Sequence, residues 1–261
     1  MLSWLKKKEV PIAAPFAAIG TDMHSHLIPG IDDGAKSVEG AIALVEGLSK
    51  LGYKKLITTP HVMSDYYKNA PETILAGLET VRAEIDRQNI DIQIDVAAEY
   101  YLDEPFLEKI GKEQLLTFGD NYLLFELSYL NPPGELMEAI FKMKSHGYQP
   151  VLAHPERYPY LSHGKNLVEF EAIKKAGALL QLNITSLSGA YSRQAKETAR
   201  RLIDADMVDF AGTDVHHIRH IERLRTLAKD KHFQKLLTSQ RLLNRSLCLL
   251  YTSDAADEKV R

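Results

Sequence analysis

The chain has 261 residues, of which 45% are hydrophobic and 26% charged, and this size and composition suit a single α/β barrel domain. The formal net charge of -3 argues against a nucleic-acid-binding surface, and no apolar run approaches the roughly 20 residues needed to span a bilayer. The single cysteine, Cys248, excludes an internal disulfide, and no arginine follows it at the spacing that a loop-type cysteine phosphatase requires.

The N-terminal residues 1–18 are interpreted as a basic tail. They begin with MLSWLKKKEV, whose apolar part is too short for a signal-peptide core and whose lysines follow that part instead of preceding it. A weak contact with a membrane surface is the alternative for this tail. The protein is therefore expected in the cytoplasm.

Short apolar runs then alternate with longer segments of helical periodicity. Several runs are continuously apolar, which is typical of strands that are buried on both faces. The runs predicted as strands are Ile19–His24, Lys55–Thr59, Asp91–Glu99, Tyr122–Leu127, Pro150–His154, Ala178–Asn183 and Val208–Gly212.

Helices are predicted between these strands. Ser37–Leu51 has apolar residues at helical spacing and is followed by Gly52, a residue that commonly ends helices, and Pro71–Gln88 starts with a proline suited to a first turn. Such alternation implies a parallel sheet, and its seven strand–helix units predict a TIM-like (β/α)7 barrel; an open doubly wound sheet is the alternative. The remaining predicted helices are Gly134–His146, Asn166–Lys175 and Ser192–Ala205.

The C-terminal residues 246–261 depart from the preceding pattern. Their sequence, SLCLLYTSDAADEKVR, interrupts the helical periodicity and resembles translated adapter sequence. We expect this segment to be a non-native tail and confine the predicted barrel to residues 19–245.

Histidines and carboxylates gather at the predicted strand ends. His24 and His26 are two positions apart on an extended chain, so their side chains face the same way, as two ligands of one metal must. Asp33 follows them, although Asp32 and Asp33 could equally be turn residues before a helix. Taken alone, each of these signals is weak.

The same kinds of residue recur after other strands. His61 and His154 lie at strand tips, and Asp214 and His216 repeat the spacing of two. Arg157 follows His154 in the loop, where its planar guanidinium could hold a phosphate, although a surface ion pair with its neighbour Glu156 is the alternative.

Two acids lie in apolar strands. Glu99 ends the run IQIDVAAE and Glu126 lies inside LLFELS. A buried carboxylate is costly unless it is paired with a cation or bound to metal. Both acids are therefore candidate ligands.

These ligands should meet, because the C-terminal ends of parallel barrel strands build one site. They exceed the needs of one metal and suit two or three ions. Imidazole and carboxylate without thiolate fit manganese, iron or zinc, and the sequence does not choose among these. The other histidines have no such spacing and are interpreted as surface residues: His146, His163, His217, His220 and His232.

The strings HSH, DDG, TPH, AEY, FEL, AHPER and TDVH, in this order and spacing, resemble the polymerase-and-histidinol-phosphatase (PHP) superfamily. Within it, the chain is most similar to bacterial PHP-type protein tyrosine phosphatases of capsular and exopolysaccharide operons. The resemblance runs from about Gly20 to about Leu243, and HSHLIPGIDDGAKS is its most specific string. It implies a distorted seven-stranded barrel and three clustered divalent ions, usually manganese.

The resemblance also implies the role of each ligand. Glu99 would bridge two ions, Arg157 would bind the substrate phosphate, and a second arginine would be Arg219, with Arg223 as the alternative. Glu99, Arg157 and Arg219 are thus the expected catalytic residues. The implied ligand sets are His24, His26, Glu99 and Asp214 for one ion, Glu99, Glu126 and His154 for a second, and Asp33, His61 and His216 for a third.

The activity implied by the resemblance is hydrolysis of phosphotyrosine on proteins by a metal-activated water. The expected substrate is the tyrosine-rich tail of a membrane-associated kinase that controls polysaccharide export, and the protein itself could be a homo-oligomer. The alternatives are a small-molecule phosphatase acting on a substrate such as histidinol phosphate, and a metal-holding regulatory domain without turnover. A PHP nuclease is disfavoured by the negative charge balance.

Overall fold

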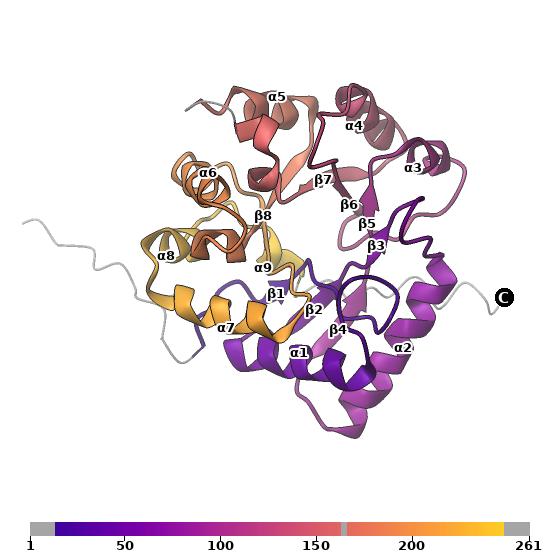
Figure 1. Cartoon of the computed structure of the whole chain (residues 1–261), viewed down its shortest axis with the longest axis vertical. Coiled ribbons are helices and arrows are strands. Elements are labelled where there is room, and N and C mark those ends of the chain that lie inside the picture. The colour runs from indigo at the N-terminus through magenta and orange to yellow at the C-terminus, as the bar shows by residue number, and fades with distance from the viewer. Residues whose placement is uncertain (1–13, 163–165, 248–261) are drawn as a thin grey trace, which may run out of the picture.

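A computed structural model describes residues 14–162 and 166–247 of the chain. Its helices surround a central group of strands (Figure 1). The strands are β1 (Thr21–Asp22), β2 (Lys55–Thr58), β3 (His61–Val62), β4 (Gln93–Val96), β5 (Glu99–Tyr101), β6 (Tyr122–Glu126), β7 (Gln149–Ala153), β8 (Leu179–Asn183) and β9 (Phe210–Gly212). The α-helices are α1 (Val38–Leu51), α2 (Pro71–Arg87), α3 (Glu104–Lys109), α4 (Leu136–Ser145), α5 (Val168–Ala176), α6 (Arg193–Asp204), α7 (Ile218–Thr226), α8 (Lys231–Leu237) and α9 (Asn244–Leu247).

The strands form two sheets in which every neighbouring pair is parallel. One sheet has the order β1-β2-β4 and the other the order β3-β5-β6-β7-β8-β9. The predicted alternation of parallel strands and helices is therefore confirmed. The five helices predicted from periodicity are present as α1, α2, α4, α5 and α6, with ends that differ by up to a few residues.

The structure corrects the boundaries of two predicted strands. The strand predicted at Lys55–Thr59 is present as β2, and a further short strand that was not predicted, β3, follows it after Pro60, which has no N–H to donate to a strand ladder. The run predicted at Asp91–Glu99 is divided at Ala97–Ala98, so Glu99 begins β5 instead of ending the strand before it. The bonds from Ala97 N to Thr58 O (2.9 Å) and from Glu99 N to Pro60 O (3.0 Å) hold the divided runs side by side.

The chain segments that follow β1 and β9 lie next to each other. Ser25 and Val215 form an isolated parallel bridge, and the N–H of His26 donates to Val215 O at 3.0 Å. Within the strands themselves, the side chain of Asn244 in α9 joins β1 to β9. Its Nδ2 donates to Thr21 O (2.9 Å) and Ala211 O (2.7 Å), and its Oδ1 accepts from Ala211 N (2.9 Å).

Parts of the expected tails pack into the fold. The ring of Phe16 is fully buried and lies 5.4 Å from that of Tyr53 and 4.7 Å from that of Phe233. At the other end, Leu247 is buried against a small core cluster that includes Phe210. Residues 1–13 and 248–261 of these tails lie outside the described residues. Within the described part of the chain, no helix combines the length and hydropathy needed to cross a bilayer.

Candidate metal centre

The structure brings together all nine residues predicted as metal ligands. Their donor atoms form four overlapping groups, and within each group these atoms lie within 4.8 Å of one another. The groups are His24, His26 and Asp214; His24, Glu99 and His154; His61, Glu99 and Glu126; and His26, Asp33, His61 and His216.

His24 and His26 present the same ring nitrogen to a common point. Their Nε2 atoms lie 3.4 Å apart, and Oδ1 of Asp214 lies 3.5 and 3.3 Å from them. The opposite nitrogen of each ring is held at 2.8 Å, that of His24 by Oε1 of Gln181 and that of His26 by Oδ2 of Asp32. An acceptor at Nδ1 fixes the proton there and leaves Nε2 to bind a metal.

Glu99 lies at the centre of the cluster. Its Oε1 is 2.9 Å from Nε2 of His154, while its Oε2 is 3.2 Å from both Nε2 of His24 and Nδ1 of His61. Oε2 of Glu99 and Nδ1 of His61 are nevertheless buried without an aligned hydrogen bond. Buried polar atoms without partners are uncommon, so two atoms that can each offer a lone pair to the same space fit a bound cation.

The charge state of these groups suits cation binding. Burial raises the pKa of Glu99, but the nearby imidazoles of His24 and His61 outweigh burial and hold this pKa well below its usual value. For His61, burial lowers the pKa and Glu99 raises it, with a net rise to about 9. The carboxylate thus stays ionised, as a metal ligand must, and a divalent ion would compete with protons for the imidazoles.

Tight turns direct two of the ligands into the cluster. His154 follows β7 with a φ of 34°, and Asp214 follows β9 with a φ of 51°. Residues other than glycine seldom adopt a positive φ, and functional sites are where such strain is often found. Close packing limits two nearby positions to glycine, because a Cβ on Gly34 would lie 2.3 Å from His26 O and one on Gly212 would lie 2.6 Å from Cβ of His24.

Arg157 lies on one side of the cluster. Its Nη1 donates to Oδ2 of Asp214 at 2.8 Å, and its guanidinium is 4.9 Å from the ring centre of Tyr129 and 4.1 Å from that of Tyr191. Asn183 also donates to Oδ2 of Asp214, at 2.6 Å. The guanidinium is therefore held beside the ligands with one edge paired and its faces covered by aromatic rings.

The second expected arginine does not contact the cluster. Arg219 and Arg223 are both exposed on α7, and within the described residues no ion pair or hydrogen bond joins them to the nine ligands. Glu156, the residue beside Arg157, is not its partner either. It is buried, and it accepts from Ser186 Oγ (2.6 Å) and Asn183 N (3.1 Å), while burial raises its pKa to about 7.

Two histidines expected at the surface are buried, which corrects that interpretation. Nδ1 of His220 lies 3.2 Å from Asp214 O beneath the cluster, because the first turn of α7 folds back under the ligand loop. His232 is buried where α8 packs on α6, and its Nε2 lies 3.4 Å from Asp204. His146 and His217 are exposed as expected, and His163 lies outside the described residues.

Residues 20–231 match the family described as capsular polysaccharide synthesis, CpsB/CapC. The chain belongs to this family. This confirms the relationship inferred from the order and spacing of the motifs.

Among curated relatives in the CpsB/CapC group, the tyrosine-protein phosphatase YwqE of Bacillus subtilis is 27% identical over 199 residues, which cover 76% of this chain and 78% of YwqE. The tyrosine-protein phosphatase CpsB of Streptococcus pneumoniae is 28% identical over 203 residues, covering 76% of this chain and 83% of CpsB. A solved structure from a study of YwqE and CpsB as metal-dependent tyrosine phosphatases matches with a TM-score of 0.75 at 24% identity, covering 88% of this chain and 94% of that one. An amidohydrolase from Mycoplasma synoviae matches with a TM-score of 0.54 at 13% identity, covering 94% of this chain and 90% of that one. These two structural matches establish the likeness of the fold.

Proposed function

We propose that this protein hydrolyses phosphotyrosine on protein substrates at the cluster around Glu99. The observation that carries the proposal is that nine imidazole and carboxylate side chains form four overlapping groups, two of which share the buried Glu99, whose Oε2 has no hydrogen-bond partner. We propose three divalent ions there, with manganese as the first choice ahead of iron and zinc. The naming of the curated relatives as tyrosine-protein phosphatases supports the substrate class.

Bound ions would activate water near neutral pH and neutralise charge on the phosphoryl oxygens. The residues of the chain hold and orient the reacting groups. Oε1 of Glu99 lies beside His154 and Oε2 beside His61, which suits a bridging carboxylate. Arg157 is pre-oriented by Asp214 and two tyrosine rings, so its remaining N–H donors can bind phosphate with little loss of side-chain entropy. Arg219 is proposed as the second phosphate ligand ahead of Arg223, after a movement of its exposed side chain.

We also propose that the two sheets together form a distorted seven-stranded barrel over residues 19–245. The bridge between Ser25 and Val215 supports this closure, as does the bond from Ala97 N to Thr58 O that links the divided strands. In this arrangement the carboxyl ends of the strands share one mouth, which is where barrel enzymes carry their active sites.

For the physiological setting, we propose that the substrate is the tyrosine-rich tail of a membrane-associated kinase and that the phosphatase acts in the cytoplasm, with a homo-oligomer as its proposed assembly. The family description links the chain to capsule synthesis and supports this setting. A phosphatase of small molecules is the rival activity, because the same ligands and Arg157 would serve any phosphate monoester. The alternative that is not an enzyme is a metal-holding regulatory domain without turnover.

The test uses metal-stripped protein to which manganese is added back. Hydrolysis of a phosphotyrosine peptide is compared with that of histidinol phosphate, and Glu99→Gln serves as the matched variant that keeps the side-chain shape. We expect manganese-dependent peptide hydrolysis that is lost in the variant. Activity confined to histidinol phosphate would indicate a small-molecule phosphatase. Metal binding without turnover of either substrate would favour the regulatory domain.

A further inference from the structure

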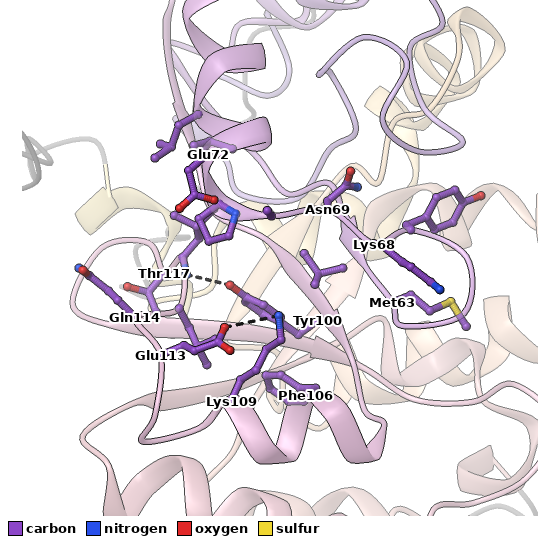
Figure 2. A pocket seen from close by; sticks show the side chains of 18 of the residues that line it. Met63, Lys68, Asn69, Glu72, Tyr100, Phe106, Lys109, Glu113, Gln114 and Thr117 are labelled. Atoms are coloured by element: carbon purple, nitrogen blue, oxygen red, sulfur yellow. Dashed lines mark hydrogen bonds and ion pairs between the residues drawn. The ribbon is translucent and has the colours of Figure 1, made fainter.

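A large groove lies beside the metal centre, between α2 and α3. Its volume is about 1670 Å³, above the roughly 300–1,000 Å³ of most small-ligand pockets. One wall comes from the loop that follows β3 and from α2, and the other from α3 and the loop before β6 (Figure 2). We call it the α2–α3 groove; its apolar lining includes Val62, Met63, Leu75, Val96 and Leu116.

The groove and the metal centre use opposite faces of the same two strands. His61 and Glu99 pair in register and point into the ligand cluster, whereas the next pair, Val62 and Tyr100, lines the groove. Since β3 ends at Val62, this end of the groove lies at the carboxyl edge of the sheet, beside the cluster.

Tyr67 contacts the ligand cluster and also lines the α2–α3 groove. Its ring stacks on that of the ligand His61, with centroids 5.4 Å apart and an interplanar angle of 14°, and it also lines the groove. Asn69, another lining residue, fixes this loop by donating to His61 O (2.8 Å) and Ile31 O (3.0 Å). A chain that leaves the cluster past Tyr67 therefore enters the groove directly.

Arg157 contacts different members of the cluster from those that Tyr67 contacts. Its guanidinium lies against the rings of Tyr129 and Tyr191 and pairs with Asp214. A substrate whose phosphate is held by Arg157 and the cluster can reach the groove by passing His61 and Tyr67, because Tyr67 both stacks on His61 and lines the groove. The groove therefore offers a place for the polypeptide that flanks the phosphorylated side chain.

The lining suits a polypeptide. Apolar side chains form its floor, and charges of both signs stand at its edges, with Lys68 and Glu72 on one wall and Lys109 and Glu113 on the other (Figure 2). Lys109 and Glu113 form an ion pair at 3.5 Å. Apolar contacts with a polar margin are the usual composition of a surface that binds a protein segment.

We infer that the α2–α3 groove binds the stretch of substrate polypeptide that flanks the phosphotyrosine. This inference rests on the proposed phosphatase function and adds to it a second contact region outside the metal centre. It predicts that the protein distinguishes a phosphotyrosine peptide from a small aryl phosphate by KM, through groove residues such as Leu75 and Lys68 that are neither candidate metal ligands nor Arg157.

The test compares a phosphotyrosine peptide of about ten residues with phenyl phosphate, in the manganese-loaded full chain. The groove variant is Leu75→Glu, because this leucine is 44% exposed on α2 and glutamate keeps the helix propensity. The matched control is Val168→Glu at the start of α5, a residue that is 54% exposed and outside the groove lining. Lys68→Glu at the groove edge is a second, independent variant.

We expect Leu75→Glu to raise the KM for the peptide about tenfold, the order expected from losing one apolar anchor, with kcat and the constants for phenyl phosphate unchanged. Val168→Glu should match the unsubstituted protein on both substrates. An unchanged peptide KM in both groove variants would overturn the inference, as would an equal loss on both substrates. A change of oligomeric state in Leu75→Glu without a change in peptide KM would instead assign the groove to contact between copies. If the unsubstituted protein hydrolyses neither substrate, it is the proposed function that fails.

Discussion

Oε1 of Gln181 accepts a hydrogen bond from Nδ1 of His24 at 2.8 Å, and the backbone N–H of His154 donates to the same oxygen at 3.2 Å. One buried amide on β8 therefore orients ligands that come from β1 and β7. Partners of this kind matter because they fix the proton on the outer ring nitrogen and aim the inner one at the metal.

Replacing Gln181 with leucine should lower metal affinity about 10- to 100-fold, the usual cost of losing such a partner. The nine ligands stay in place, but His24 loses the acceptor that sets its tautomer. Isothermal titration of metal-stripped protein with manganese measures the effect. Gln181→Glu, which keeps an acceptor oxygen, should retain more affinity than the leucine variant, and equal affinity in all three proteins would contradict this role.

Arg157→Lys should lower kcat/KM for aryl phosphates about 100-fold, comparable to the loss of one preorganised donor in other enzymes. Lysine keeps the charge but loses the planar guanidinium that contacts Tyr129 and Tyr191. Steady-state kinetics of the lysine variants of Arg157, Arg219 and Arg223 separate the three arginines. An Arg157 variant with normal kinetics would remove it from phosphate binding, and a defect in only one of the α7 variants would identify the second arginine.

Removal of metal should destabilise the protein. An ion present at 1,000 times its Kd contributes about 4 kcal/mol, which in a chain of this size corresponds to a fall in Tm of roughly 10 °C on chelation. Calorimetry before and after chelation, followed by manganese addition, measures it. Glu99→Gln provides the control, since it should show a much smaller difference between its two states. A Tm that does not respond to chelation would contradict a folded, metal-filled cluster.

Phe16→Ala should destabilise the fold by about 3–5 kcal/mol, the usual cost of truncating a buried phenylalanine. Phe16 lies in the segment interpreted from the sequence as a tail, yet its ring is buried between Tyr53 and Phe233. Urea denaturation compares this variant with Phe141→Ala, whose ring is 72% exposed. Equal midpoints for the two variants would mean that the stability of the fold does not depend on the segment.

The clustering of the candidate ligands could be predicted from sequence because strand geometry is local. Two histidines at a spacing of two on an extended chain must face the same way, and an acid such as Glu126 in an apolar strand signals a buried partner. The chain then brings separate strand ends together through its parallel topology. The overall order of strands and helices was predictable for the same reason.

The supporting residues were harder to predict because their roles depend on distant partners. Asp32 has the composition of a turn residue, and only the fold shows it holding His26 Nδ1. Gln181 was a usable signal, since a polar side chain in the apolar run ALLQLN needs a buried partner, but the partner His24 is 157 positions away. His220 was misjudged because its burial depends on how α7 folds back under Asp214.

Asn244 has a consequence for how the protein is made. Its side chain joins β1 to β9, and the cluster needs both His24 beside β1 and Asp214 beside β9. A ribosome delivers β1 early, but the asparagine that joins it to β9 lies 223 positions after Thr21. The nascent chain therefore carries His24 and His26 through the synthesis of all the intervening residues without their partners across this seam, and the cluster can assemble fully only once residues up to Asn244 have left the ribosome.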